Sequence, residues 1–101
     1  MFSRGRKLSL EELKVLREEV ARITLEIIRL SSRRLSLVRK IGEIKARNNM
    51  PVEDPLVEDD LKARVIDLSK KYNVNVDFSL KLLNLLLEES KRVQREIMKS
   101  R

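Results

Sequence analysis

Cationic and amide side chains are the groups in this sequence whose types and spacing suit chemistry. Arg34 and Lys45 are eleven residues apart. In a helix this spacing is three turns plus about 20°, which places both cations on one face, about 16 Å apart along the axis. Two long side chains leaning toward each other would leave room for a small dianion between them. For Arg34 a salt bridge to a glutamate of a partner helix is the alternative interpretation.

Arg17 is a third candidate cation, at a different place on the same predicted helix. It lies about 25 Å along the axis from Arg34 and is rotated from it by about 100°. The two arginines therefore cannot contact one small ligand from a single helix. An antiparallel dimer could bring Arg17 of one chain beside Arg34 of the other, whereas the alternative is an ordinary solvated residue.

Polar residues also fall on faces that are otherwise apolar or at helix starts. Ser90 and Gln94 are spaced i, i+4 among leucines and isoleucines. They either have buried partners or lie where this stripe reaches solvent. Asp54 and Glu58 occupy N-cap and first-turn positions, which helix capping explains. Gly42 costs about 1 kcal/mol inside a helix and indicates close approach of a neighbouring backbone or ligand.

A long helix must position most of these groups. Apolar residues spaced alternately three and four apart form a heptad seam, interrupted only by Arg34. We predict a helix from Ser9, as N-cap, to about Arg47, where Asn48, Asn49 and Pro51 stop it. Its length of about 57 Å exceeds a compact domain of this size, so the seam requires a partner chain. The seam consists of Leu13, Leu16, Val20, Ile23, Ile27, Leu30, Leu37, Ile41 and Ile44.

Two shorter helices are predicted after this one. Asp54 and Pro55 suit the N-cap and first position of the second helix, and Asp77 suits the cap of the third, which continues to about Met98. The predicted buried stripe of the second helix is Leu61, Val65, Leu68 and Tyr72. That of the third is Leu82 or Leu83, Leu86 or Leu87, Ser90, Gln94 and Ile97.

Composition favours an all-α protein and excludes several kinds of chemistry. Only 2 Gly, 2 Pro and 3% aromatic residues accompany 39% charged residues, a profile typical of long helices. Cysteine and histidine are absent, which excludes disulfides, thiol chemistry, the usual zinc sites and imidazole triads. Carboxylate-only metal sites remain possible in principle, but no acidic cluster has suitable spacing. We predict one domain, residues 9–101, after a basic tail, residues 1–8.

The net charge of +7 is typical of a nucleic-acid binder, but much of it is terminal. Five charges belong to terminal residues, which leaves +2 for residues 8–98. Residues 33–47 hold six basic residues and one acid, a patch that suits a small anion better than a polyanion. No apolar run suits a membrane span or a signal peptide, so we expect a cytoplasmic protein that binds neither membrane nor nucleic acid. The five terminal residues are Arg4, Arg6, Lys7, Lys99 and Arg101.

Taken together, these residues resemble the active-site set of the all-α class of chorismate mutases. The resemblance covers residues 13–98 without a gap. It includes the surrounding stretches Leu16-Arg17-Glu18, Arg33-Arg34-Leu35, Gly42-Glu43-Ile44-Lys45, Pro51-Val52-Glu53-Asp54 and Glu88-Glu89-Ser90 through Gln94. The resemblance implies a three-helix protomer in an intertwined homodimer with two equivalent sites. It also implies the Claisen rearrangement of chorismate to prephenate, in phenylalanine and tyrosine biosynthesis, without metal or cofactor.

The resemblance also implies a role for each polar residue. Arg17 would reach into the partner's site and bind the enolpyruvyl carboxylate of chorismate, while Arg34, helped by Ser90, would hold the ring carboxylate. Lys45 and Gln94 would donate hydrogen bonds to the ether oxygen, where negative charge grows as the C–O bond breaks. The ring hydroxyl would be bound by Asp54, mainly through its backbone, and by Glu58. Such a rearrangement needs a compact substrate conformer and well-placed charge, not a nucleophile.

Two positions depart from the family pattern, and two other functions remain open. Val57 replaces an arginine that usually precedes Glu58, which removes a positive charge near the site; Thr24 replaces an acid. An isochorismate-pyruvate lyase would share the fold and nearly the same cationic pocket. A non-catalytic helical dimer, serving as an adaptor or binding nucleic acid, predicts instead that Arg34 and Lys45 are exposed.

Overall fold

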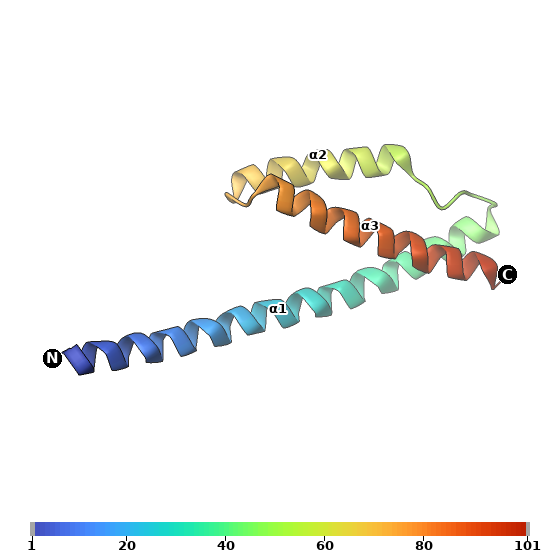
Figure 1. Ribbon diagram of the computed structural model, residues 1–101. Coiled ribbons are helices and arrows are strands. Elements are labelled where there is room, and N and C mark those ends of the chain that lie inside the picture. Colours follow the sequence, from blue (N-terminus) through green and yellow to red (C-terminus); the bar gives the residue numbers. More distant parts are fainter. Residues whose placement is uncertain (1, 101) are drawn as a thin grey trace. The chain divides into compact units, whose positions relative to one another are not determined.

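The computed structural model describes residues 2–100, with the side chains of residues 9–100. It contains three helices, α1 (Phe2–Arg47), α2 (Pro55–Lys71) and α3 (Val76–Lys99), and no strand in the part described (Figure 1). The prediction of an all-α, three-helix chain is therefore confirmed. None of the described helices has an apolar stretch long enough for a membrane span. The chain divides into two units, Met1–Arg34 and Leu35–Arg101.

The first unit consists of α1 residues alone. The helix begins at Phe2, so the prediction that Ser9 caps it is wrong: helical backbone runs through most of the predicted tail. From Ser9 to Leu30 every side chain is exposed to solvent. The hydroxyl of Thr24 donates to the carbonyl of Val20 on its own helix (2.9 Å), so this polar residue is satisfied locally. The seam residues of this unit are 40–63% exposed: Leu13, Leu16, Val20, Ile23, Ile27 and Leu30.

The ends of α1 and α2 follow from backbone chemistry at asparagine. Asn49 and Asn73 adopt positive φ (53° and 55°), which asparagine tolerates better than most residues. The chain then turns back, and the N–H of Met50 donates to the carbonyl of Lys45 (2.8 Å). The predicted end of α1 at Arg47 is confirmed. So are the positions of Asp54 and Pro55 at the start of α2.

Helix α3 begins two residues earlier than the sequence indicated. Its N-cap is Asn75, whose Oδ1 accepts a hydrogen bond from the N–H of Phe78 (2.8 Å). Asp77 lies within the first turn, so the prediction that it caps this helix is wrong. There its charge complements the positive end of the helix dipole instead.

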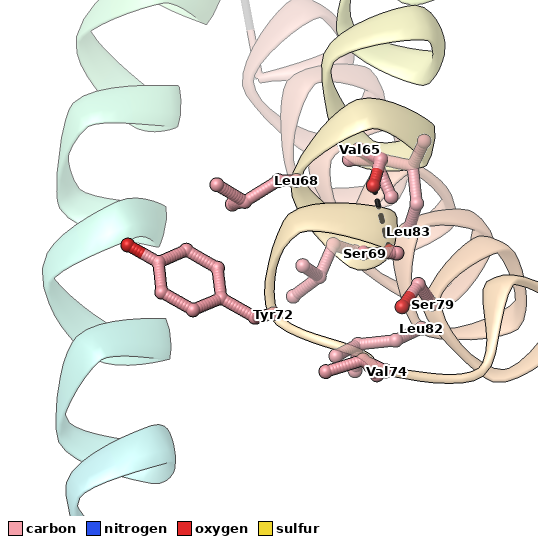
Figure 2. A pocket seen from close by; sticks show the side chains of 9 residues that line it. Val65, Leu68, Ser69, Tyr72, Val74, Ser79, Leu82 and Leu83 are labelled. Carbon is pink, nitrogen blue, oxygen red and sulfur yellow. Dashed lines mark hydrogen bonds between the residues drawn. The ribbon is translucent and has the colours of Figure 1, made fainter.

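The second unit packs α2 against α3. Leu83 is buried on α3, which decides between Leu82 and Leu83, because Leu82 is exposed. On α2 the buried face includes Ser69, whose hydroxyl donates to the carbonyl of Val65 (2.7 Å). The prediction that Leu68 and Tyr72 are buried is wrong: they are 56% and 64% exposed. In Figure 2 both side chains point away from Leu83. Together with Leu83 they line an apolar pocket of about 220 Å³.

The last turns of α1, which belong to the second unit, bury a face different from the heptad seam. Val38, Gly42 and Lys45 are buried, and Gly42 lies against Gln94 and Ile97 of α3. A Cβ added at Gly42 would come within 3.1 Å of Ile97 Cδ1 and 3.5 Å of Gln94 Cα. The close approach predicted at this glycine is therefore confirmed. The seam residues Leu37, Ile41 and Ile44 remain exposed, so packing within the chain does not use the seam.

Candidate active site

Lys45 is a buried cation at the end of α1. The residue is 4% exposed, and its Nζ donates to the carbonyl of Val52 (2.8 Å) and to Oδ2 of Asp54 (2.5 Å). Both acceptors belong to the loop that turns back over the last turn of α1. An ammonium has three N–H donors, and within the described part of the chain these are the two groups that accept from it. One donor therefore remains for a ligand.

Asp54 occupies the predicted N-cap position but does not use its side chain as a cap. No hydrogen bond joins its carboxylate to the first turn of α2, because that carboxylate pairs with Lys45. Its backbone carbonyl accepts from the N–H of Glu58 (2.9 Å). The capping interpretation of the Asp54 side chain is therefore wrong, and the residue instead holds the lysine in place.

Ser90 and Gln94 are buried on α3, each 6% exposed. The interpretation in which their stripe runs out into solvent is therefore wrong. The hydroxyl of Ser90 donates to the carbonyl of Leu86 (2.8 Å), one turn earlier in the same helix. Gln94 packs against Gly42, and Lys45 follows Gly42 by three residues on the same face of α1. Lys45 and Gln94 therefore lie along the same buried face of α1.

The amide of Gln94 has a buried oxygen that is left without a hydrogen bond. Its Oε1 has no partner among the described residues. A buried polar atom in this state costs about 1–3 kcal/mol, and such costs are typically tolerated where a group serves a ligand. Packing at Gly42 holds this amide in place. Because glycine has no side chain, α3 comes close enough to α1 to enclose the amide.

A second ionic cluster surrounds Glu58. Lys91 of α3 pairs with Oε1 of Glu58 (2.7 Å) and with Oε2 of Glu53 (2.9 Å), and Arg95 also pairs with Glu53 (3.2 Å). The hydrogen bond from Lys91 holds the pKa of the Glu53 carboxyl below its usual value. Lys91, Glu53 and Arg95 are not among the site residues predicted from the sequence. The sequence offers one indication of this cluster, the spacing of Lys91 and Arg95. They are one turn apart on α3, and two cations near a polar stripe favour acidic partners.

Arg17 and Arg34 belong to the first unit. Arg17 is exposed, whereas Arg34 is half-buried, and burial lowers the pKa of its guanidinium from the ordinary value. Arginine stays protonated through such shifts, so Arg34 is a partly desolvated cation. In the second unit, Lys45 contacts Asp54, and Gln94 packs against the face of α1 that contains Lys45. Glu58 forms an ion pair with Lys91, the residue that follows Ser90 in the sequence.

The second unit therefore presents a lysine ammonium and an amide, both buried, and carboxylates that are fixed by cations. Hydrogen-bond donors held in this way stabilise negative charge that develops on an oxygen. No group of three or more acidic side chains in the described residues is placed to hold a metal ion.

Comparison with known proteins decides the family. The family model described as "Chorismate mutase type II" matches residues 16–95. The chain belongs to the type II chorismate mutase family. This match confirms the resemblance stated from the residues, and it spans every residue of the candidate site.

Curated members of the chorismate mutase family align with most of the chain. A chorismate mutase of Methanocaldococcus jannaschii is 29% identical over 89 residues, covering 88% of this chain and 90% of that protein. A bifunctional chorismate mutase/prephenate dehydratase of Buchnera aphidicola is 33% identical over 87 residues, covering 86% of this chain. The bifunctional enzyme of Aquifex aeolicus is 42% identical over 62 residues, or 61% of this chain. The chain spans about a quarter or less of these bifunctional relatives, 23% of the Buchnera protein and 17% of the Aquifex protein.

Proposed function

We propose that this chain is an isomerase that rearranges chorismate to prephenate without a cofactor. One observation supports the proposal most: two hydrogen-bond donors suited to the reaction are buried at the face of α1 that contains Gly42. Lys45 is part of that face, and Gln94 packs against it. Membership of the chorismate mutase family supplies the substrate class. The Methanocaldococcus relative named a chorismate mutase, of which the alignment covers 90%, supports this activity for a chain of similar length.

The proposed mechanism places positive charge where the breaking bond needs it. As the ether C–O bond lengthens, negative charge grows on its oxygen. Lys45 has one N–H not used by Val52 or Asp54, and this donor would point at that oxygen together with the Gln94 amide N–H. A million-fold acceleration requires about 8 kcal/mol, which preorganised donors in a desolvated site supply. Because Gln94 is a neutral donor, activity should persist across neutral pH.

The remaining candidate residues would bind the substrate rather than act on the breaking bond. Arg34, with Ser90, would hold the ring carboxylate, and Arg17 of a second chain would bind the enolpyruvyl carboxylate. Asp54, through its backbone, and Glu58 would bind the ring hydroxyl. These contacts would hold the substrate in the compact conformer that the rearrangement requires.

We also propose that two copies of the chain form a homodimer through the heptad seam. The seam residues from Leu13 to Leu30 are 40–63% exposed in the single chain, and a continuous apolar stripe of this length is unfavourable in water. A second α1 offers the matching stripe, since each a and d residue would fill a space between residues of the facing helix. The dimer would also bring Arg17 of one chain to the site of the other.

The test is loss of chorismate and appearance of prephenate, followed by absorbance, with the molar mass of the chain in solution measured by sedimentation. We expect prephenate to form and the mass to be that of a dimer. Incubation with isochorismate in parallel distinguishes the lyase alternative, which would release pyruvate. Absence of any product from chorismate would contradict the proposed mutase activity, and a monomer at assay concentration would contradict the shared site.

A further inference from the structure

Lys91 of α3 lies between two carboxylates that come from different segments of the second unit. Glu58 is in the first turn of α2, and Glu53 is in the loop before it; their distances to Lys91 Nζ are 2.7 and 2.9 Å. The side chains of Lys91 and Glu58 are 19% and 21% exposed, whereas that of Glu53 is 50% exposed. Lys91 therefore holds the more buried carboxylate, that of Glu58, from the opposite helix.

Charge gives this contact a consequence for an anionic ligand. Glu53 and Glu58 place two negative charges together, which would repel a dianion bound nearby. Lys91 opposes them, and its pKa is raised chiefly by its hydrogen bond to Glu53 and next by that to Glu58, so it stays protonated at neutral pH. Because residue 57 is valine, the positive charge at Glu58 comes from α3 and not from the neighbouring residue of α2.

We propose that Lys91 is a positioning residue: it fixes the Glu58 carboxylate to receive a substrate hydroxyl and neutralises the charge of that carboxylate beside the anionic substrate. This inference rests on the proposed function. Lys91 acts through Glu58 and does not touch the reacting atoms. Its effect should therefore be on substrate binding, because a hydroxyl held equally in the ground state and the transition state changes KM and leaves kcat nearly unchanged.

Arg95 provides a matched control on the same helix. It lies one turn after Lys91 and pairs with Glu53 (3.2 Å), but none of the described contacts joins it to Glu58. Its side chain is half exposed, so the Arg95–Glu53 pair is a surface ion pair of small effect. Substitution of Arg95 thus removes a cation from the cluster without releasing the Glu58 carboxylate.

The experiment measures kcat and KM for chorismate with the full chain carrying Lys91→Met, Lys91→Arg or Arg95→Met. Methionine keeps much of the apolar stem of lysine and removes the charge. We expect Lys91→Met to raise KM about tenfold, which corresponds to about 1.4 kcal/mol. The value of kcat should stay within about threefold of wild type. Lys91→Arg should restore KM, and Arg95→Met should change it less than about twofold.

Two further variants separate positioning from a general effect on folding. Glu58→Gln combined with Lys91→Met should raise KM no further than Glu58→Gln alone, because Lys91 acts through that carboxylate. If Lys91→Met does not fold, the double variant Glu53→Gln/Lys91→Met replaces it, because this variant leaves one fewer unpaired carboxylate. Its KM must be raised to the same extent. The inference is overturned if the KM of Lys91→Met is no higher than that of Arg95→Met. It is also overturned if Lys91→Met lowers the unfolding temperature but leaves KM unchanged. Failure of the wild-type chain to convert chorismate is a different outcome, which contradicts the proposed function itself.

Discussion

Lys45 Nζ donates to Oδ2 of Asp54 at 2.5 Å, across nine residues of chain. Lys45 belongs to the last turn of α1, and Asp54 is the residue immediately before α2. The pair therefore closes the loop between the two helices and fixes the direction of a buried ammonium. A carboxylate that the sequence pattern assigns to helix capping is used instead to orient a cation.

Asp54→Asn should test the pair without disturbing the start of α2, because the Asp54 side chain makes no cap hydrogen bond there. The substitution leaves Lys45 buried without its charged partner, so we expect the free energy of unfolding to fall by about 1–3 kcal/mol. We also expect kcat for chorismate to fall about tenfold as the ammonium loses its fixed direction. Urea unfolding and steady-state kinetics measure the two effects. Asp59→Asn, at an exposed position of α2, is the control, and equal behaviour of both variants would contradict the role given to the pair.

Lys45→Met should remove the donor to the ether oxygen while keeping an apolar stem in the buried position. Loss of one preorganised donor to developing negative charge typically lowers kcat by about 100- to 1000-fold, and we expect a decrease of that size. The chain should remain folded and dimeric, as judged by circular dichroism and sedimentation. Lys40→Met, at an exposed position of the same helix, should leave kcat unchanged. Turnover of Lys45→Met at the wild-type rate would exclude Lys45 from the reaction.

Features of the fold that depend on local chemistry were predictable. The stop of α1 at Arg47 and the start of α2 at Asp54 and Pro55 follow from residues that fix the backbone themselves. The cap of α3 was misassigned because two residues of similar capping strength, Asn75 and Asp77, lie close together. The exposed positions of Leu68 and Tyr72 were not predictable from periodicity, which identifies an apolar face but not what covers it.

The residues of the candidate site were likewise predictable only where local chemistry indicated them. Gly42 indicated a close approach, because glycine inside a helix lowers its stability and packing is what explains the residue at this position. In the structure, α3 lies against Gly42. Lys91 gave no comparable signal, because its partners Glu53 and Glu58 are more than thirty residues away and become neighbours only through packing of α2 on α3. Ser90 and Gln94 were identified as polar residues on an apolar face, but whether that face was buried depended on the tertiary structure.

The Glu53 carboxyl gives an expectation for stability against pH. Its pKa in the folded chain lies below the ordinary 4.5, first because of the hydrogen bond from Lys91. The unfolded chain therefore binds this proton more readily, so Glu53 stabilises the fold at pH values above 4.5 and the contribution is lost as pH falls through the folded pKa. The pKa of Lys91 is raised, so its contribution is fully present throughout this acid range.

Glu53→Gln should accordingly be less stable than wild type at neutral pH, and the difference should shrink as pH falls below about 4.5. Urea unfolding midpoints at a series of pH values between about 7 and 3 measure this. Glu11→Gln, at an exposed position of α1, controls for the change in net charge. A difference between Glu53→Gln and wild type that stays constant down to the lowest pH would show that the carboxylate does not stabilise the fold through its charge.

Gly42 should tolerate one methyl group but not a branched side chain. In Gly42→Ala the new Cβ meets the flexible end of Ile97 at 3.1 Å, and the gain in helix propensity of about 1 kcal/mol offsets the small shift required. We expect stability within about 1 kcal/mol of wild type. Gly42→Val adds bulk against the backbone of Gln94 and should cost about 1–3 kcal/mol and lower kcat. Lys40→Val carries the same β-branched residue at an exposed position of α1, and equal loss in both valine variants would contradict close packing at Gly42.

The proposed sharing of sites between two chains predicts a specific pattern of complementation. Arg17→Ala and Arg34→Ala should each be nearly inactive alone, because every site of either homodimer lacks one arginine. In a mixed dimer, one site combines Arg34 of one chain with Arg17 of the other, and the second site lacks both. Refolding the two variants together in equal amounts makes about half of the dimers mixed, each with one intact site of two, so about a quarter of wild-type activity should return. Mixing Arg34→Ala with Lys45→Ala is the control: both residues would serve the site of their own chain, so no mixed dimer would have an intact site. No recovery with Arg17→Ala would mean that Arg17 does not act across the dimer, and recovery in the control would mean that Arg34 and Lys45 of one chain do not serve the same site.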